Sequence, residues 1–502
     1  MSRKLIVTAA SLLLLAGVLW ILNSGKPTTR VLFYCAASNR AVMEEIRTEY
    51  EKETGRRVEI QYGPSQTLLS QIEVSKRGDL YLPADISYLD IGREKGLIGE
   101  RLDIARMEAV LVIPKGNPKQ IDALSDLWEN DLRVVQANPD AAAIGKVTRR
   151  VLTESSLWDK LDAATDAYRT TVTDVANDVL VGAADVGIVY DAVLHTYPDL
   201  EYVEIPELAP AASQIAVSVL EVTEQSDAAF HFARYVAARD RGLEKYEQHG
   251  FRIDEGDAWA DLPKISIFAG SMLRPAIEET IIEFEKREGI QIERVFNGCG
   301  ILVGQMKAGQ SPDAYFACDQ EFMNQVVDLF PEPVDVSENE LVILVKKGNP
   351  KEIWSLKDLT RDGLKVGIGH EKQCAMGWIT QNTFRESGIQ EEVMSNVVVQ
   401  TPTGDLLVNQ LRAGSLDAAV VYLSNAAGSA DLLDAVQIQG LPCSVAIQPW
   451  AVAKESKFPQ LTSRLFAQIC SAESQGTFAA EGFRWRHGKE SEEEQNAASA
   501  PN

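Results

Sequence analysis

The chain is poor in positive charge, in histidine and in cysteine for its length of 502 residues. It has 49 Lys and Arg residues against 73 Asp and Glu residues, and its formal net charge is −24. Nucleic acids and anionic membrane surfaces are bound by clustered Lys and Arg, so this balance argues against both. The six cysteines lack the paired spacing of a structural zinc site. The charge does not exclude a small anionic ligand, because helix N-termini bind anions through backbone N–H groups.

One long uncharged run stands at the N-terminus. Residues 5–22 follow the basic pair Arg3 and Lys4, so residues 1–25 are predicted to be a signal peptide or a membrane anchor. The basic pair would stay in the cytoplasm and direct the rest of the chain to a periplasmic or extracytoplasmic location. No small-x-small cleavage site precedes Lys26, which favours an uncleaved anchor in the inner membrane over a cleaved peptide. A buried core helix fits the terminal position and the basic flank poorly.

The sequence repeats itself once. Residues 113–119 (IPKGNPK) recur as residues 345–351 (VKKGNPK), an offset of 232 from 113 to 345. The same offset relates Gly145 to Gly377, Tyr190 to Tyr422 and residues 250–252 (GFR) to 482–484 (GFR). Nearer the start of each half the offset is 234, which relates Tyr50 to Phe284, Asp79 to Asp313 and Asp85 to Asp319. A register kept over this length indicates a tandem duplication.

The repeat defines the predicted domains. The first domain spans 30–253 and the second spans 264–486, joined by the acidic, poorly patterned linker 254–263. Residues 487–502 are rich in Glu, Ser, Ala and Asn without apolar periodicity, so they are predicted to be a disordered tail.

Each half alternates short apolar strands with amphipathic helices. In the first half we predict strands at 31–34 and 58–62, a helix at 40–54 that ends at Gly55, and a helix at 67–76. Such alternation is typical of parallel sheets covered by helices, so the fold class is α/β.

Four stretches of the first half resemble one known family. They are residues 36–38 (AAS), 62–73 (YGPSQTLLSQIE), 138–145 (NPDAAAIG) and 187–192 (GIVYDA). They are similar to the molybdate- and tungstate-binding periplasmic proteins. The resemblance implies two tandem domains of the type II periplasmic-binding-protein fold, each of two α/β lobes with a hinge that closes over an oxyanion. It places the lobe crossovers of the first domain near 84–108 and 202–215.

The resemblance also implies the ligand contacts of the first domain. Ser38 and Ser65 each follow a strand and precede a helix, where hydroxyl and backbone N–H groups suit a tetrahedral oxyanion. Helix N-capping is the alternative role for both serines. Tyr190 matches the family tyrosine whose hydroxyl contacts the anion; the alternative is a buried aromatic at a strand end. Ile144 and Val175 match positions that offer backbone N–H groups.

The second domain departs from this pattern. The register places Met272 opposite Ser38, and Cys299 opposite Ser65. Its predicted ligand-binding set is Ser271, Met272, Cys299, Met376 and Tyr422. Nearby stand Cys318, Cys374 and His370.

Three interpretations of the second cleft are open. Cys299 and Cys374 could form a disulfide across the lobes in an oxidising compartment. Cys299, Cys374 and Met376 could form a soft site for a thiophilic metal such as Cu(I). Packing or degeneration is the third interpretation, because Cys and Met are frequent core residues.

The predicted function is capture of a small inorganic oxyanion by an extracytoplasmic protein that serves an ABC transporter permease and ATPase. No cofactor is expected beyond the bound molybdate-like or tungstate-like ligand. The alternative is a membrane-tethered sensor or assembly protein that uses the same fold. An enzyme is disfavoured: Cys299, His370 and Asp319 could suggest a thiol hydrolase, but no nucleophile motif surrounds Cys299.

Overall fold

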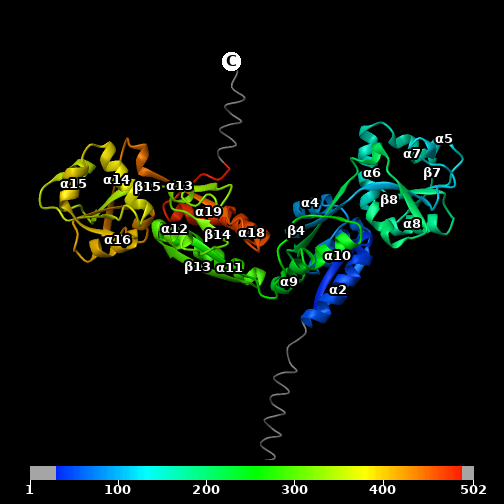
Figure 1. Ribbon diagram of the computed structural model, residues 1–502, viewed down its shortest axis with the longest axis horizontal. Coiled ribbons are helices and arrows are strands. Elements are labelled where there is room, and N and C mark those ends of the chain that lie inside the picture. The colour runs from blue at the N-terminus through cyan, green and yellow to red at the C-terminus, as the bar shows by residue number, and fades with distance from the viewer. Residues whose placement is uncertain (1–29, 489–502) are drawn as a thin grey trace, which may run out of the picture. The chain divides into compact units, whose positions relative to one another are not determined.

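The computed structural model describes residues 30–488, which form two compact units that divide between Glu255 and Gly256 (Figure 1). The predicted N-terminal anchor lies outside the described residues. Between residues 30 and 488, no helix combines the length and apolar character needed to cross a membrane. His487, predicted to belong to the tail, donates its N–H to the carbonyl of Val336, so the fold extends to this residue.

Each unit contains two lobes, named here lobe A and lobe B. Lobe A of the first unit is a six-stranded sheet with the order β11-β4-β10-β3-β1-β2, in which β1 pairs in parallel with β2 and β3. β1 is buried over most of its length, as expected for a parallel strand that helices cover on both faces. The elements of lobe A are β1 (Arg30–Ala36), η1 (Ala37–Asn39), α2 (Arg40–Thr54), β2 (Arg57–Gly63), α3 (Ser65–Ser75), β3 (Leu80–Leu82), α4 (Ser87–Glu94), β4 (Ile98–Met107), β10 (Ser213–Leu220), α9 (Ser226–Val236), α10 (Gly242–Gln248) and β11 (Arg252–Ile253).

Lobe B of the first unit is a five-stranded sheet with the order β7-β6-β8-β5-β9. Figure 1 shows it as a separate body that carries α6, α7 and α8. Its elements are β5 (Ala109–Pro114), α5 (Asp126–Glu129), β6 (Val134–Ala137), α6 (Ala143–Glu154), α7 (Trp158–Ala164), β7 (Thr165–Arg169), α8 (Val172–Leu180), β8 (Val186–Tyr190), η2 (Asp191–Thr196) and β9 (Leu200–Val203); η3 (Pro206–Leu208) lies on the return to lobe A.

The chain crosses between the lobes of the first unit twice. The first crossing is at Glu108, between β4 of one sheet and β5 of the other. The second runs from β9 to β10, through residues 204–212. Both crossings fall within the predicted ranges, and they form the two-strand hinge of the domain.

The second unit repeats this architecture, with one long strand shared by both lobes. β15 pairs with β20 and β21 through its first half, and with β18 and β19 through its second half. Its elements are β12 (Lys264–Gly270), η4 (Ser271–Leu273), α11 (Arg274–Glu288), β13 (Gln291–Asn297), α12 (Cys299–Lys307), β14 (Ala314–Phe316), α13 (Gln320–Asn324), β15 (Val334–Lys346), η5 (Leu356–Thr360), β16 (Val366–Gly369), α14 (Ala375–Glu386), α15 (Gln390–Asn396), β17 (Val397–Thr401), α16 (Gly404–Arg412), β18 (Ala418–Tyr422), α17 (Leu423–Ala426), β19 (Leu433–Gln437), η6 (Pro442–Ser444), β20 (Val445–Val452), α18 (Pro459–Ile469), α19 (Ala472–Ala480) and β21 (Arg484–Trp485).

The backbone register of the repeat matches the sequence offset. Arg30 pairs with Arg57 in the first unit, and Lys264 pairs with Gln291 in the second, so both partners move by 234 positions. The two units can therefore be compared residue by residue, with an offset of 234 early and 232 later.

Candidate functional site

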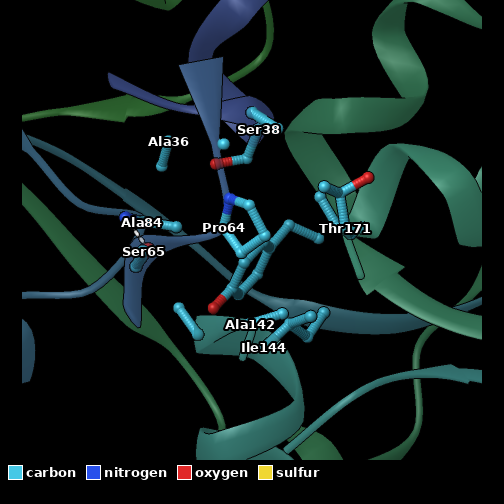
Figure 2. A pocket seen from close by; sticks show the side chains of 13 residues that line it. Ala36, Ser38, Pro64, Ser65, Ala84, Ala142, Ile144 and Thr171 are labelled. Carbon is cyan, nitrogen blue, oxygen red and sulfur yellow. Dashed lines mark hydrogen bonds between the residues drawn. The ribbon is translucent and has the colours of Figure 1, made fainter. Parts of the chain in front are cut away.

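Three helices of the first unit begin at one small cavity between the lobes. These are α3 from lobe A and α6 and α8 from lobe B, and their first residues are Ser65, Ala143 and Val172. The cavity contains about 250 Å³ of empty space, counting the part open to solvent (Figure 2). Its lining residues are Ala36, Ala37, Ser38, Gly63, Pro64, Ser65, Ala84, Ala142, Ala143, Ile144, Thr171, Val172 and Tyr190. The N–H groups of a first helical turn have no carbonyl partner within the helix, so these starts suit an anion.

Ser65 presents a hydroxyl with a fixed role. It is the first residue of α3, and the N-cap is Pro64, so the hydroxyl does not cap the helix. Its Oγ accepts the N–H of Ala84 at 3.1 Å (Figure 2), and its carbonyl accepts the hydroxyl of Tyr81 at 2.8 Å. Because a backbone N–H already donates to this Oγ, the serine proton is directed toward another acceptor.

Ser38 is held in the same manner by a chain of side chains. Its Oγ accepts Nδ2 of Asn39 at 3.2 Å, and Oδ1 of Asn39 accepts the hydroxyl of Tyr246 at 3.1 Å. Ser38 makes no side-chain cap bond at α2, so the capping role is absent here too. The network leaves the Ser38 proton free for an acceptor in the cavity.

Tyr190 stands at the end of β8 and supplies the third hydroxyl. Its oxygen lies 2.7 Å from Oγ of Ser213, the first residue of β10. Burial raises the pKa of Tyr190 well above its ordinary value, so the phenol stays neutral. With Ser213 as donor, the Tyr190 proton is available to a ligand.

The lobe B contacts differ from the prediction at one position. Ile144 lines the cavity in the first turn of α6, as expected. Val175 does not line it: this residue is one turn inside α8, and its N–H donates to the carbonyl of Thr171. Thr171, the N-cap of α8, and Val172 stand at the cavity instead. The sequence spacing between Val175 and Tyr190 was too weak a signal to locate the start of α8.

The described residues that line this cavity carry no formal charge. The lobes touch around it, because the N–H of Gln66 donates to the carbonyl of Ala141 at 3.3 Å across the cleft. Lys146 of α6 lies outside the lining, where its Nζ donates to Oγ of Ser87 at 3.2 Å and sits over the ring of Tyr88. The first unit is thus a closed domain whose cleft offers neutral hydrogen-bond donors.

In the second unit, sulfur replaces oxygen at the start of α12. Cys299 takes the place of Ser65, and its Sγ accepts the N–H of Cys318 at 3.1 Å, as Ser65 accepts the N–H of Ala84. The Sγ atoms of Cys299 and Cys318 are 2.7 Å apart, and both side chains are buried. Cys318 is therefore a cleft residue that the predicted site set lacks, although the offset of 234 from Ala84 identifies it.

The hydroxyl network of the first unit is missing from the second. Leu273 and Phe478 stand where Asn39 and Tyr246 stand in the first unit, and both are buried. Val445 occupies the position of Ser213. Within residues 30–488, no group hydrogen-bonds to the buried hydroxyl of Tyr422. Three apolar side chains have thus replaced the groups that orient Ser38 and Tyr190.

The remaining predicted residues of the second cleft come from both lobes. Met272 is buried in η4, beside the half-exposed Ser271. Met376 is buried in the first turn of α14 and packs close to Gly369 of β16. Cys374 is the N-cap of α14, and burial raises its pKa to about 12. Its Sγ forms no disulfide with Cys299, whose near neighbour is Cys318.

The predicted soft-metal site of Cys299, Cys374 and Met376 includes a methionine and stays a prediction. Among the described residues, no group of three or more His, Cys, Asp or Glu side chains is placed to hold a metal ion. His370 accepts the N–H of Lys372 through Nδ1 at 3.3 Å, whereas the Cys299 thiol is hydrogen-bonded to Cys318.

A protein-family model described as bacterial extracellular solute-binding protein matches this chain twice, over residues 31–252 and 265–484. The chain belongs to this family. The double match confirms the tandem α/β periplasmic-binding fold and the resemblance to molybdate-binding proteins seen in the sequence. A solute-binding family is a family of transport proteins that act outside the cytoplasm.

Relatives of this solute-binding protein match about one half of it. The protein named molybdate-binding protein ModA of Mycobacterium tuberculosis is 30% identical over 225 residues, which cover 44% of this chain and 84% of the relative. A putative ABC transporter substrate-binding lipoprotein of Bacillus subtilis is 28% identical, covering 44% of this chain and 85% of the relative. A solved substrate-binding domain of a putative molybdenum ABC transporter from Clostridium difficile is 25% identical, with coverage of 45% and 99% and a TM-score of 0.37.

Proposed function

We propose that the first domain of this solute-binding protein captures a tetrahedral oxyanion of the molybdate or tungstate class and delivers it to an ABC transporter permease and its ATPase. One observation carries the proposal. Three hydroxyls, from Ser38, Ser65 and Tyr190, meet three helix starts at a closed cavity whose lining is uncharged. The name of the Mycobacterium tuberculosis relative supports the same ligand class.

Neutral donors suit a fully ionised oxyanion. The hydroxyls and the first-turn N–H groups without a protein partner replace hydrogen bonds of the hydration shell when the lobes close, and the helix starts favour negative charge. Phosphate keeps a proton near neutral pH, and that proton needs an acceptor. Ser38 and Ser65 already accept hydrogen bonds from Asn39 and Ala84 and are oriented to donate, so they are poor acceptors for that proton. Discrimination against sulfate depends on the size of the cavity, because molybdate and tungstate are larger.

The second domain does not share this ligand site in our proposal. Its cleft has Met272 and Cys299 in place of the two serines, and it lacks the side chains that orient the hydroxyls. One oxyanion per chain is therefore expected.

Isothermal titration calorimetry of the full-length chain tests the proposal. Molybdate and tungstate should each bind with a stoichiometry of one per chain, and sulfate and phosphate should give at least tenfold weaker binding. A protein that gives no heat with any of the four anions contradicts the oxyanion site. Two equal sites per chain would contradict the division of roles between the domains.

A further inference from the structure

The second cleft contains a pair of thiols in near-bonding contact. Cys299 opens α12, Cys318 follows β14, and their Sγ atoms are 2.7 Å apart, against about 2.0 Å for a disulfide bond. Both belong to lobe A, so joining them requires no movement of one lobe against the other. The backbone N–H of Cys318 also donates to Sγ of Cys299 at 3.1 Å, which holds the two residues in register.

The residues around the two thiols differ from their first-domain counterparts, and the differences make room for two sulfur atoms. The first domain has Ala36, Ser65 and Ala84 at the three positions where the second has Gly270, Cys299 and Cys318. A Cβ added at Gly270 would lie inside contact distance of Sγ of Cys318 and press on Sγ of Cys299. Loss of one methyl group thus provides the space that two sulfur atoms need. Loss of ligand binding alone would not explain why Gly270, Cys299 and Cys318 all differ from the first domain together.

A metal ion is a poorer explanation of the same sulfur atoms. The described residues include no cluster of three or more His, Cys, Asp or Glu ligands.

We propose that Cys299 and Cys318 are a disulfide site, closed by exchange with a small external disulfide. The thiolate of one cysteine attacks a sulfur of the external disulfide, forms a mixed disulfide and releases one thiol. The other cysteine then attacks the protein sulfur of that mixed disulfide, forms the Cys299–Cys318 bond and releases the second thiol. Each protein thiol loses one proton, and the external disulfide is reduced to two thiols.

The location of the family outside the cytoplasm favours the oxidised form. Because both thiols are buried, exchange takes place during folding or when the lobes open. The disulfide lies at the position of the Ser65 hydroxyl in the first domain, so the second cleft has no hydrogen-bond donor there. The bond also holds the start of α12 against the end of β14. The second domain would then keep its shape through a covalent bond rather than through a bound oxyanion.

The test is to refold the full-length chain in a buffer of glutathione and glutathione disulfide, alkylate the free thiols in denaturant without reductant, and digest without reduction. Trypsin separates the cysteines of interest, because it cuts after Arg294, Lys307, Lys346, Lys372 and Arg385. We expect alkylation to fall from six cysteines to four, with peptide 295–307 linked to peptide 308–346.

Three variants make the result specific. Cys318→Ala, which restores the first-domain residue, should leave all five remaining cysteines alkylated. Gly270→Ala should reduce the linked fraction, because its methyl group displaces the sulfurs. Cys470→Ser, far from the pair in sequence, should leave the linkage intact. Full alkylation of the wild type overturns the proposal, and so does a link between peptide 295–307 and peptide 373–385. Neither result bears on oxyanion binding by the first domain.

Discussion

At the scale of single residues, the first cleft depends on hydroxyls that already hold hydrogen bonds to the protein. The N–H of Ala84 donates to Ser65, Nδ2 of Asn39 donates to Ser38, and Ser213 is paired with Tyr190. A hydroxyl that accepts one hydrogen bond from the protein is oriented to donate its own proton. This arrangement directs the protons of Ser38 and Ser65 toward the cavity, and that of Tyr190 as well when Ser213 is the donor between them. It is the physical basis for selecting an unprotonated anion.

Ser65→Ala should weaken molybdate binding by roughly tenfold to hundredfold, because a hydrogen bond to a charged group contributes about 1.5–3 kcal/mol. The change leaves the first-turn N–H groups of α3 in place, so binding should be reduced rather than abolished. Titration calorimetry on the full-length chain measures the effect. Ser75→Ala is the matched control, since Ser75 is the exposed last residue of the same helix. Equal affinity of Ser65→Ala and the wild type would remove Ser65 from the site.

Asp319 gives the second domain a predictable pH dependence. It is the N-cap of α13, and burial raises its pKa from 3.8 to about 6. The folded state therefore binds more protons than the unfolded state between these values, so the free energy of unfolding falls as the pH rises from about 4 to about 6. The loss is at most about 3 kcal/mol, at 1.36 kcal/mol for each pKa unit.

Asp319→Asn should remove this loss, since the amide does not titrate and its oxygen can still accept the N–H of Glu321. We expect the variant to be more stable than the wild type at pH 7 and nearly equal to it at pH 4, as measured by urea unfolding. Asp362→Asn, at an exposed turn residue, is the control and should change neither value. A variant that is less stable than the wild type at pH 7 would show that the charged carboxylate is favourable there.

The sequence indicated several residues that line the candidate cavity, but not the groups around them. Ser38, Ser65, Ile144 and Tyr190 line one cavity as expected, because each stands at a strand end or helix start that local pattern reveals. Val175 lies one turn inside α8 and does not line the cavity. The groups that orient the hydroxyls are distant in sequence, and no local pattern connects Asn39 with Tyr246.

At the scale of elements, local signals predicted the first helix well. The predicted helix at 40–54 coincides with α2, because Gly55 takes the left-handed conformation (φ 71°) that ends it. The next helix was predicted to begin at Thr67 but begins at Ser65. Pro64 is the N-cap of this helix, so a proline directly precedes its first residue. This two-residue error matters, since it separates a loop serine from one in the first turn.

The sheet order could not be predicted from local pattern. β10 lies antiparallel between β3 and β4, although more than one hundred residues separate it from either strand in sequence. This long-range pairing returns the chain to lobe A and creates the hinge. Only the resemblance to a known family anticipated it, and the crossings at Glu108 and residues 204–212 agree with that expectation.

At the scale of the whole molecule, duplication has kept the fold and changed one cleft. The strand pairs have the same register in both units, as β1–β2 and β12–β13 show. The differences concentrate at the oxyanion position: sulfur for oxygen at two places, and apolar side chains where the first domain orients its hydroxyls. Each change removes a donor or its support, so the loss of the site is distributed over several contacts.

If these differences are sufficient, reversing them should rebuild an oxyanion site in the second domain. The graft replaces cleft residues by their first-domain counterparts: Gly270→Ala, Met272→Ser, Leu273→Asn, Cys299→Ser, Cys318→Ala, Val445→Ser and Phe478→Tyr. We expect the molybdate stoichiometry of the full-length chain to rise from one to two, measured by calorimetry.

The matched control is the same graft with Cys299 retained, which should bind the second molybdate at least tenfold more weakly because the α12 hydroxyl is absent. Both variants keep the α12 and α14 helix starts and Tyr422, so any difference between them reports the single oxygen-for-sulfur exchange. A graft that folds and still binds one molybdate would locate the missing determinant in lobe B. There the first-turn residues Met376 and Gly404 differ from Ile144 and Val172 of the first domain.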